Sequence, residues 1–267
     1  MRERCKLALG DSMKAFDILD MIDRERKPRE AGLTMVLDKG LGRNAADDLM
    51  EYADYIDVIK LGWGTSRFCQ ESTIKEKIAC YKENDILVSN GGTLFEIAYS
   101  QGRVDDFLRY AQRIGLNSIE VSDGSIDLEG EKAKIIRRGI EMGFEVFSEV
   151  GKKEPTEDAK LTIDQRIDEA KSDLSAGASK VIIEAREGGK GIGIFDREGN
   201  VKEDMARELI EKIGLKNIIF EAPMKSQQVY LILNFGSDVN LGNIKTDDVV
   251  PLETLRRGFR GDTFGKL

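Results

Sequence analysis

The amino-acid sequence predicts an α/β protein built as a (β/α)₈ barrel with a short N-terminal extension. Eight short runs rich in Val, Ile and Leu recur along the chain, with helical patterns between them. Strands that alternate with helices need crossover connections and therefore form a parallel sheet. The 267 residues also suit one barrel of roughly 250 residues. A doubly wound open sheet uses the same alternation, and the count of eight units favours the barrel over it.

The eight expected strands follow one another at intervals typical of single βα units. In chain order they are Leu33–Lys39, Tyr55–Leu61, Ile86–Ser89, Ser118–Ser122, Phe144–Val150, Lys180–Arg186, Asn217–Ala222 and Val239–Ile244. Each run is short and apolar, as expected for strands that helices cover on the outside.

Three of the intervening helices can be placed from their apolar spacing. A capping box of Thr162 and Gln165 opens one helix, whose apolar residues recur every three or four positions until Gly177. A similar stripe begins at Val104 and ends at Gly115, and a third includes Ile74, Ile78 and Tyr81.

The domain organisation is simple. No Pro-rich or Ser-rich linker and no change of composition interrupts residues 31–267, so we expect one catalytic domain there. Residues 1–30 form an extension that a barrel does not require, and we expect it to be helical near Met13–Ile22.

Composition excludes several functional classes. A net charge of −8 gives no electrostatic reason to bind nucleic acid or an anionic membrane surface. No apolar run is long enough to cross a bilayer, and residues 1–30 lack the apolar stretch of a signal peptide. Three cysteines (Cys5, Cys69 and Cys80) are too few and too scattered for a disulfide framework or a zinc site. We expect a soluble, cytoplasmic protein.

The absence of histidine is the most restrictive feature of the composition. It excludes Ser-His-Asp and Cys-His nucleophilic sites, histidine-bound zinc and an imidazole proton shuttle. Acid–base chemistry would therefore depend on carboxylates, lysines, tyrosines or cysteines. A bound metal would have oxygen ligands, which favours Mg²⁺.

Charged residues stand at the C-terminal ends of six of the expected strands, where barrel enzymes build their active sites. One such charge would be explained by a solvated strand end, but six strands together are harder to explain in that way. The residues are Asp38, Lys39, Lys60, Asp123, Glu149, Glu184, Arg186 and Glu221, and Glu120 lies slightly earlier in its strand.

Side-chain alternation orders some of these charges. It places Glu184 and Arg186 on one face of their strand, which we take as the barrel interior. It also places Lys153 on the side of Glu149, but alternation weakens beyond the end of a strand, so Lys152 remains a rival.

Glycine-rich turns follow three of the expected strands: Gly62-Trp63-Gly64-Thr65, Gly91-Gly92-Thr93 and Gly188-Gly189-Lys190-Gly191. Such turns before helices can offer backbone N–H groups to an anion, although any single one is explained equally by a tight turn. Together with nearby cations they predict a small anionic substrate, and the carboxylates predict a Mg²⁺ ion bridging to it. Mutual salt bridges at the barrel mouth are the alternative. The cations are Lys39, Lys60, Lys153 and Arg186.

Over residues 31–267 the chain resembles the phosphosulfolactate synthase family, on long and unusual strings. These strings are Leu37-Asp38-Lys39-Gly40, Lys60-Leu61-Gly62-Trp63-Gly64-Thr65, Gly91-Gly92-Thr93-Leu94-Phe95-Glu96, Ser122-Asp123-Gly124-Ser125, Glu149-Val150-Gly151-Lys152-Lys153, Ile183-Glu184-Ala185-Arg186-Glu187, Phe220-Glu221-Ala222-Pro223, Lys225-Ser226-Gln227-Gln228 and the tail Leu255–Lys266. Asn90 stands where we would expect proline in other members, a change confined to a loop.

The resemblance implies a Mg²⁺-dependent barrel enzyme, of the carbon–sulfur lyase class, that adds sulfite to phosphoenolpyruvate in coenzyme M biosynthesis. The product would be (2R)-phospho-3-sulfolactate. The expected metal ligands come from Glu120, Asp123, Glu149, Glu184 and Glu221. The expected substrate-binding residues are Lys39, Lys60, Arg186, Gly91, Gly92 and Gly189.

A lysine would protonate the enolate-like intermediate. Lys153 is our first choice, with Lys152 and Lys60 as the other candidates. Burial among other cations would lower the pKa of this lysine toward the working pH.

Two other functions stay open from the sequence. A Schiff-base aldolase acting on a phosphorylated substrate could use Lys153 or Lys60 as its nucleophile. A non-enzymatic role is the second, because the family also resembles plant heat-stress-associated proteins. For the enzyme we expect small-molecule partners and a homo-oligomer.

Overall fold

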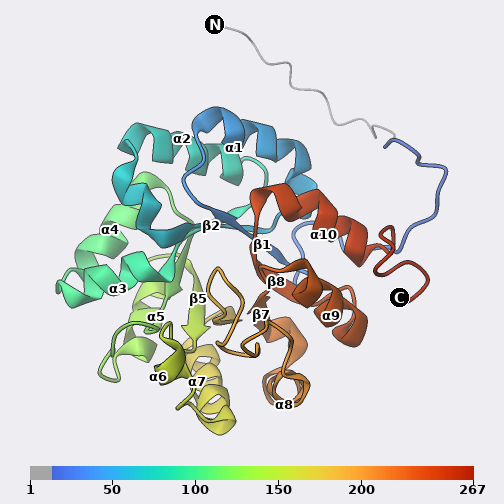
Figure 1. Cartoon of the computed structure of the whole chain (residues 1–267). Helices are drawn as coiled ribbons and strands as arrows, with labels where there is room; N and C mark the ends of the chain where they lie inside the picture. The colour runs from blue at the N-terminus through green and yellow to red at the C-terminus, as the bar shows by residue number, and fades with distance from the viewer. Residues whose placement is uncertain (1–13) are drawn as a thin grey trace, which may run out of the picture.

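The structure is a computed structural model, and it describes residues 14–267. Eight parallel strands form one sheet in the order β3-β2-β1-β8-β7-β6-β5-β4, and β3 lies against β4, so that the sheet closes on itself. The helices surround this sheet, and the C-terminus lies near the N-terminal arm (Figure 1). The predicted (β/α)₈ barrel is confirmed.

The strands lie close to the ranges that the sequence predicts. They are β1 (Thr34–Asp38), β2 (Val58–Leu61), β3 (Leu87–Asn90), β4 (Ser118–Val121), β5 (Glu145–Val150), β6 (Lys180–Ile183), β7 (Ile218–Glu221) and β8 (Asn240–Ile244). The largest differences have local causes. β2 begins late because Met50–Tyr55 form the 3₁₀ helix η1, and β6 ends early, before Arg186 takes a positive φ of 60°.

The helices confirm the three placements made from apolar spacing, which correspond to α2, α4 and α7. The helices are α1 (Arg43–Leu49), α2 (Glu71–Lys82), α3 (Gly92–Ser100), α4 (Val104–Ile114), α5 (Lys132–Glu141), α6 (Pro155–Asp158), α7 (Ile163–Ala176), α8 (Glu203–Ile213), α9 (Lys225–Phe235) and α10 (Val249–Arg256). Three further 3₁₀ helices are η2 (Gly62–Phe68), η3 (Leu215–Asn217) and η4 (Thr246–Asp248). Thr162 and Gln165 form the expected capping box of α7. Within residues 14–267, none of the helices has the length and apolar character that crossing a membrane requires.

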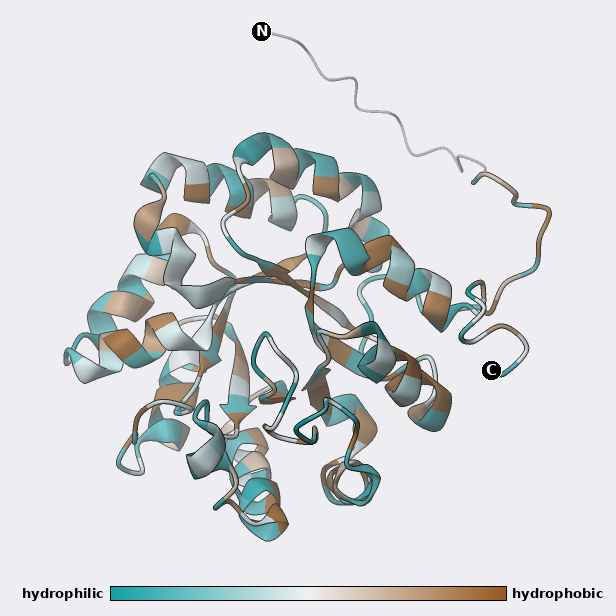
Figure 2. Ribbon diagram, viewed as in Figure 1, coloured by the Kyte–Doolittle hydropathy of each residue, from teal (hydrophilic) through white to brown (hydrophobic). Residues whose placement is uncertain are grey.

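Two apolar layers hold the barrel together. The larger one lies between the strands and the helices, and Figure 2 shows the central strands mostly brown and the helices mixed in colour. The smaller one fills the lower barrel interior with Met35, Val58, Phe147, Ile182 and Ile219. Alternate residues of a strand point to the same side, so the layer above this one holds the charged residues two positions further along the chain. These are Lys60 on β2, Glu149 on β5, Glu184 just after β6 and Glu221 on β7. The candidate active-site residues therefore lie directly above an apolar layer of the barrel interior.

The N-terminal arm differs from its prediction. Residues 14–22 form a turn and extended chain rather than a helix, while Met13 and Cys5 lie outside the described residues. Phe16 and Ile18 are 79% and 90% exposed, so these two apolar side chains provide little packing that would stabilise a helix. The arm instead attaches to the barrel through an ion pair of Arg24 with Glu253.

Candidate active site

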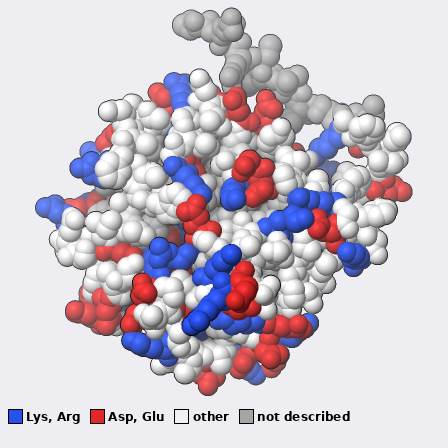
Figure 3. Space-filling view, in the orientation of Figure 1, with Lys and Arg blue, Asp and Glu red and all other residues white. Residues whose placement is uncertain are grey.

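A cavity of about 410 Å³ opens at the C-terminal ends of the strands. Figure 3 shows Lys and Arg atoms beside Asp and Glu atoms around the centre of this face. The cavity is lined by Leu37, Lys60, Gly62, Trp63, Gly91, Gly92, Thr93, Glu120, Ser125, Glu149, Lys153, Glu184, Arg186, Glu187, Glu221 and Asn243. Most of the site residues that the sequence predicts therefore meet in one place.

Three buried carboxylates form the centre of the cavity. Glu149 on β5, Glu184 after β6 and Glu221 on β7 each offer one oxygen, and these oxygens lie within 4.8 Å of one another. Backbone groups hold two of them: the N–H of Arg186 donates to Glu184 at 2.6 Å, and that of Ala185 donates to Glu221 at 3.0 Å. Neighbouring parallel strands thus present converging oxygen ligands.

The charges of this group are strongly coupled. Burial and the nearby charge of Glu149 raise the pKa of Glu184 well above its ordinary value. Burial would also raise the pKa of Glu149, but the ammonium groups of Lys153 and Lys60 outweigh it and lower this pKa. Glu184 therefore holds a proton more readily than the adjacent Glu149, and the pair can share one proton. A bound cation can take the place of that proton.

Lys60 stands between two acidic residues on the barrel interior. Its Nζ lies 2.8 Å from Glu120 Oε2 and 2.9 Å from Glu221 Oε1. Burial alone would lower the pKa of Lys60, but Glu120 and Glu221 raise it well above the ordinary value. Burial also raises the pKa of Glu120 to about 7, and the nearby ammonium group of Lys60 offsets this rise only in part.

Lys153 points into the cavity on the side of Glu149, as strand alternation predicts. Its Nζ lies 2.7 Å from Glu96 Oε1, 3.0 Å from Ser122 Oγ and 3.2 Å from Glu149 Oε1. The expectation that other cations surround this lysine and lower its pKa is wrong. Burial does act in that direction, but Glu149 and Glu96 raise the pKa of Lys153 above its ordinary value.

Glu96 is the site residue that the sequence reasoning missed. It lies on α3, is 2% exposed, and its Oε1 lies within hydrogen-bonding distance of both Ser122 Oγ and Lys153 Nζ. The available signal was a single acidic residue inside the otherwise uncharged segment Gly92–Ser100.

Some predicted site residues lie outside the cavity lining. Asp123 lies between Lys152 Nζ at 3.2 Å and Lys132 Nζ at 3.3 Å, away from the three central carboxylates. Gly189 packs against Gln227, which donates a hydrogen bond to its carbonyl at 2.6 Å. Asp38, at the end of β1, also turns away from the site.

The carboxylate of Asp38 binds the backbone of its own loop and the helix behind it. Its Oδ2 lies 2.6 Å from Lys77 Nζ, and its Oδ1 accepts the N–H groups of Gly40 and Leu41. Its neighbour Lys39 lies at the rim, where its Nζ pairs with Glu187 and lies 4.5 Å from the centre of the Trp63 ring. The contacts of Asp38 therefore fix the backbone of the loop that carries Lys39.

The glycines after β2 and β3 permit close packing of neighbouring loops. The N–H of Gly91 donates to the carbonyl of Leu61 at 2.9 Å, and that of Gly92 donates to Glu120 Oε1 at 2.7 Å. A Cβ at Gly92 would lie 2.6 Å from the Cβ of Ser122. These two N–H groups thus bind protein acceptors here, and glycine is required by the lack of space.

The electrostatic balance of the cavity favours a divalent cation. Five buried carboxylates surround two ammonium groups, so negative charge is in excess. Buried charges are costly unless they are paired, and Mg²⁺ prefers carboxylate oxygens. The carboxylates are Glu96, Glu120, Glu149, Glu184 and Glu221, and the ammonium groups are those of Lys60 and Lys153.

Comparison with known proteins identifies the family. The family model described as (2R)-phospho-3-sulfolactate synthase (ComA) matches residues 22–262. The chain belongs to this family. It is 52% identical over 257 residues to the phosphosulfolactate synthase of Methanocaldococcus jannaschii, covering 96% of this chain and all of that protein. The phosphosulfolactate synthase of Methanothermobacter thermautotrophicus is 48% identical over 257 residues, covering 96% of this chain and 99% of the relative.

Similarity to solved structures extends the comparison to the fold alone. KGPDC from Streptococcus mutans superposes with a TM-score of 0.52 at 15% sequence identity, covering 85% of this chain and 94% of that one. The family assignment therefore rests on sequence, and the barrel architecture is shared more widely. Members of the phosphosulfolactate synthase family are named as enzymes, which implies small-molecule substrates for this chain.

Proposed function

We propose that this protein is a Mg²⁺-dependent phosphosulfolactate synthase, a carbon–sulfur lyase that adds sulfite to phosphoenolpyruvate and forms (2R)-phospho-3-sulfolactate. The observation that carries the proposal is the arrangement of three converging carboxylates beside the ammonium group of Lys153 in one cavity. The names of the relatives support the product, and the proposal extends to a place in coenzyme M biosynthesis.

The central carboxylates are the residues that would hold Mg²⁺. Glu149, Glu184 and Glu221 supply oxygen ligands, and hydrogen bonds from Ala185 and Arg186 orient two of them. When bound, the ion would stabilise the negative charge that develops on the substrate carboxylate. The excess of buried negative charge in the cavity fits this assignment.

The reaction forms one carbon–sulfur bond and one carbon–hydrogen bond. The sulfur lone pair of sulfite attacks the methylene carbon of phosphoenolpyruvate, and the double-bond electrons move through the adjacent carbon into the carboxylate. That adjacent carbon then takes a proton from Lys153. The phosphate ester is retained, so the site needs no phosphoryl-transfer groups. Solvent returns a proton to Lys153 after each turnover.

Lys153 suits the role of proton donor for two reasons. Its raised pKa keeps it protonated at neutral pH, and Glu96 and Ser122 hold its Nζ at 2.7 Å and 3.0 Å. A donor fixed on one side of the substrate adds the proton to one face, which accounts for a single product stereoisomer. Lys60 is held between Glu120 and Glu221, and this position is better suited to electrostatic stabilisation.

The substrates are anions, and the rim supplies cations to attract them. Lys39 and Arg186 lie at the mouth of the cavity, with ion-pair or hydrogen-bond partners that the substrate can replace. The N-terminus of α3, at Gly92 and Thr93, also faces the cavity, and a helix N-terminus favours negative charge.

The electrostatics disfavour the aldolase alternative. A Schiff base requires a neutral lysine amine, whereas carboxylates raise the pKa of both Lys60 and Lys153. The buried charges also disfavour a purely structural role, because burying unpaired carboxylates reduces stability unless a ligand compensates.

A product assay tests the proposal. Purified protein is incubated with phosphoenolpyruvate, sulfite and Mg²⁺, with and without EDTA, and the product is identified by mass spectrometry and phosphorus NMR. We expect phosphosulfolactate that forms only with free Mg²⁺. A folded protein that yields no product would contradict the proposal, and borohydride trapping with a carbonyl substrate would then test the aldolase.

A further inference from the structure

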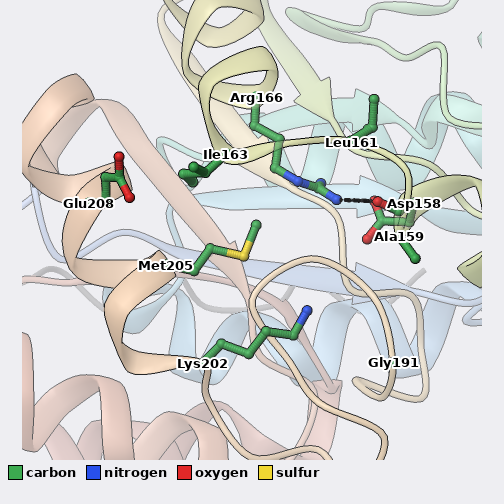
Figure 4. Close-up of a pocket in the computed structure, with 9 residues that line it drawn as sticks. All are labelled: Asp158, Ala159, Leu161, Ile163, Arg166, Gly191, Lys202, Met205 and Glu208. Atoms are coloured by element: carbon green, nitrogen blue, oxygen red, sulfur yellow. Dashed lines mark hydrogen bonds and ion pairs between the residues drawn. The ribbon is translucent and has the colours of Figure 1, made fainter.

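A buried ion pair lies directly behind the active-site cavity. Asp158, the last residue of α6, and Arg166 on α7 are each 2% exposed. Arg166 Nη2 lies 2.8 Å from Asp158 Oδ1 and donates to the Asp158 carbonyl at 2.8 Å. Figure 4 shows the guanidinium group directed at Asp158.

The two oxygens of Asp158 bind two different active-site loops. Oδ1 accepts the N–H of Lys152 at 2.9 Å, in the loop that carries Lys153. Oδ2 accepts the N–H of Gly193 at 2.8 Å, in the loop that follows β6 and contains Glu184 and Arg186. One carboxylate therefore links the proton-donor loop to the loop that carries the metal ligand Glu184.

Gly193 lies directly against the backbone of Glu184. A Cβ at Gly193 would lie 2.2 Å from the carbonyl oxygen of Glu184, so no residue other than glycine fits there. Gly193 also has a positive φ of 58°, which favours glycine. Because Asp158 fixes the N–H of Gly193, it also fixes the segment that covers Glu184.

The same glycine is held from its other side by Lys202. The Nζ of Lys202 donates to the Gly193 carbonyl at 2.7 Å. Lys202 also lines a second cavity of about 410 Å³, together with Asp158 and Arg166 (Figure 4). Solvent-accessible space thus lies behind Asp158 and Arg166. Ile192, Ile194 and Phe195 are buried on either side of Gly193, and the hydrogen bonds to Asp158 and Lys202 add to this packing.

We propose that Asp158, oriented by Arg166, is a positioning residue that sets the distance between Lys153 and the metal ligand Glu184. The inference rests on the proposed function. A carboxylate suits this role, since its two acceptor oxygens bind both loop N–H groups and Arg166 together.

Asp158→Asn removes one acceptor while keeping the size of the side chain. In the assay with phosphoenolpyruvate, sulfite and Mg²⁺ we expect kcat to fall about 10- to 100-fold, because small misplacements of reacting groups reduce rates by such factors. KM should change less than kcat, since neither Asp158 nor Arg166 lines the substrate cavity.

Asp57→Asn is the matched control. Asp57 is also buried, accepts the N–H of Thr34 at 2.8 Å and pairs with Arg29, but it lies at the opposite end of the barrel. We expect this variant to retain the kcat of the wild type. An equal loss of kcat in both variants would overturn the inference, because stability alone would then explain it.

Hydrogen exchange provides a readout that needs no substrate. In Asp158→Asn we expect faster exchange in residues 151–153 and 191–194 together, and in neither segment of Asp57→Asn. Unchanged exchange, or a change in one segment only, would overturn the inference. If the wild type yields no product, the proposed function fails, and exchange still decides whether Asp158 couples the loops. If Asp158→Asn does not fold, Arg166→Lys replaces it with the same expectations.

Discussion

The two ends of the barrel bury charge in different ways. At the N-terminal end, the guanidinium group of Arg256 is fully buried and donates to the carbonyls of Leu33, Val239 and Ser237. Arg24 pairs with Glu253 beside it. At the C-terminal end, five buried carboxylates share two lysines.

This difference separates stabilising charge from functional charge. At the N-terminal end, backbone carbonyls and acidic residues bind the guanidinium groups of Arg24 and Arg256, although the Nε of each has no hydrogen-bond partner within residues 14–267. These groups attach the arm and the C-terminal helix to the barrel. At the C-terminal end, negative charge exceeds positive charge, and a cation is needed to balance it. Substitutions at the C-terminal end are therefore expected to alter catalysis, and substitutions at the N-terminal end are expected to alter stability.

The largest expected effect is on catalysis at the C-terminal end. Lys153→Met removes the proposed proton donor, and we expect kcat to fall about 10²- to 10⁴-fold. Lys152→Met is the matched control, because Lys152 pairs with Asp123 outside the cavity, and we expect a much smaller loss. Steady-state kinetics on folded variants measure both. Near-normal turnover of Lys153→Met would exclude this lysine as the acid.

The next effect is on stability at the N-terminal end. Arg256→Met removes a hydrogen-bond donor from three carbonyl groups, of which that of Leu33 still accepts the N–H of Leu241. We expect the free energy of unfolding to fall by about 3 kcal/mol. Denaturant unfolding measures the loss, and kcat of the folded fraction should stay unchanged. A variant that is as stable as the wild type would show that this end does not depend on its buried arginine.

A smaller effect concerns pH. Burial raises the pKa of Glu120 from 4.5 to about 7, so between these pH values the native state binds more protons than the unfolded chain. The free energy of unfolding of metal-free protein should therefore fall as pH rises through this window. The raised pKa of Glu184 acts in the same direction, and the chain contains no histidine that would titrate there.

Glu120→Gln tests this assignment. We expect a shallower dependence of unfolding free energy on pH between 5 and 7 than in the wild type, measured by denaturant unfolding in EDTA. Glu187→Gln, a change of the same type at the exposed rim, should keep the slope of the wild type. Identical slopes for Glu120→Gln and the wild type would refute the role of Glu120.

The smallest expected effect is on stability at the rim. Glu187→Gln breaks the ion pair between Glu187, whose side chain is 53% exposed, and Lys39, whose side chain is 32% exposed. We expect the free energy of unfolding to fall by less than about 1 kcal/mol. Thermal unfolding at low and high salt checks this. A loss as large as that of Arg256→Met would show that the rim pair stabilises the fold.

Much of this architecture could be predicted from the sequence, because apolar strands and helix caps are local signals. The capping box at Thr162 and the strand-end glutamates are examples of such signals. The sequence did not reveal which groups surround Lys153, because Glu96 reaches it from a different βα unit. The role of Asp158 could not be predicted either, because it joins two loops that are distant in the sequence.

The N-terminal arm shows a different limit. Its apolar residues predict a helix, but the exposed Phe16 and Ile18 have no packing surface, and a short isolated helix is unstable in water. Alternation along β6 likewise could not anticipate the positive φ of Arg186, whose side chain is exposed but still lines the cavity together with Glu184.

A Mg²⁺ titration of thermal unfolding tests the central claim most directly. If the excess of carboxylates at the C-terminal end is a metal site, Mg²⁺ should stabilise the metal-free wild type, by about 2.7 kcal/mol at 100 times the dissociation constant. The same titration should have little effect on Glu149→Gln, Glu184→Gln or Glu221→Gln, and its full effect on Arg256→Met. Equal stabilisation of all these variants, or none of the wild type, would contradict the account.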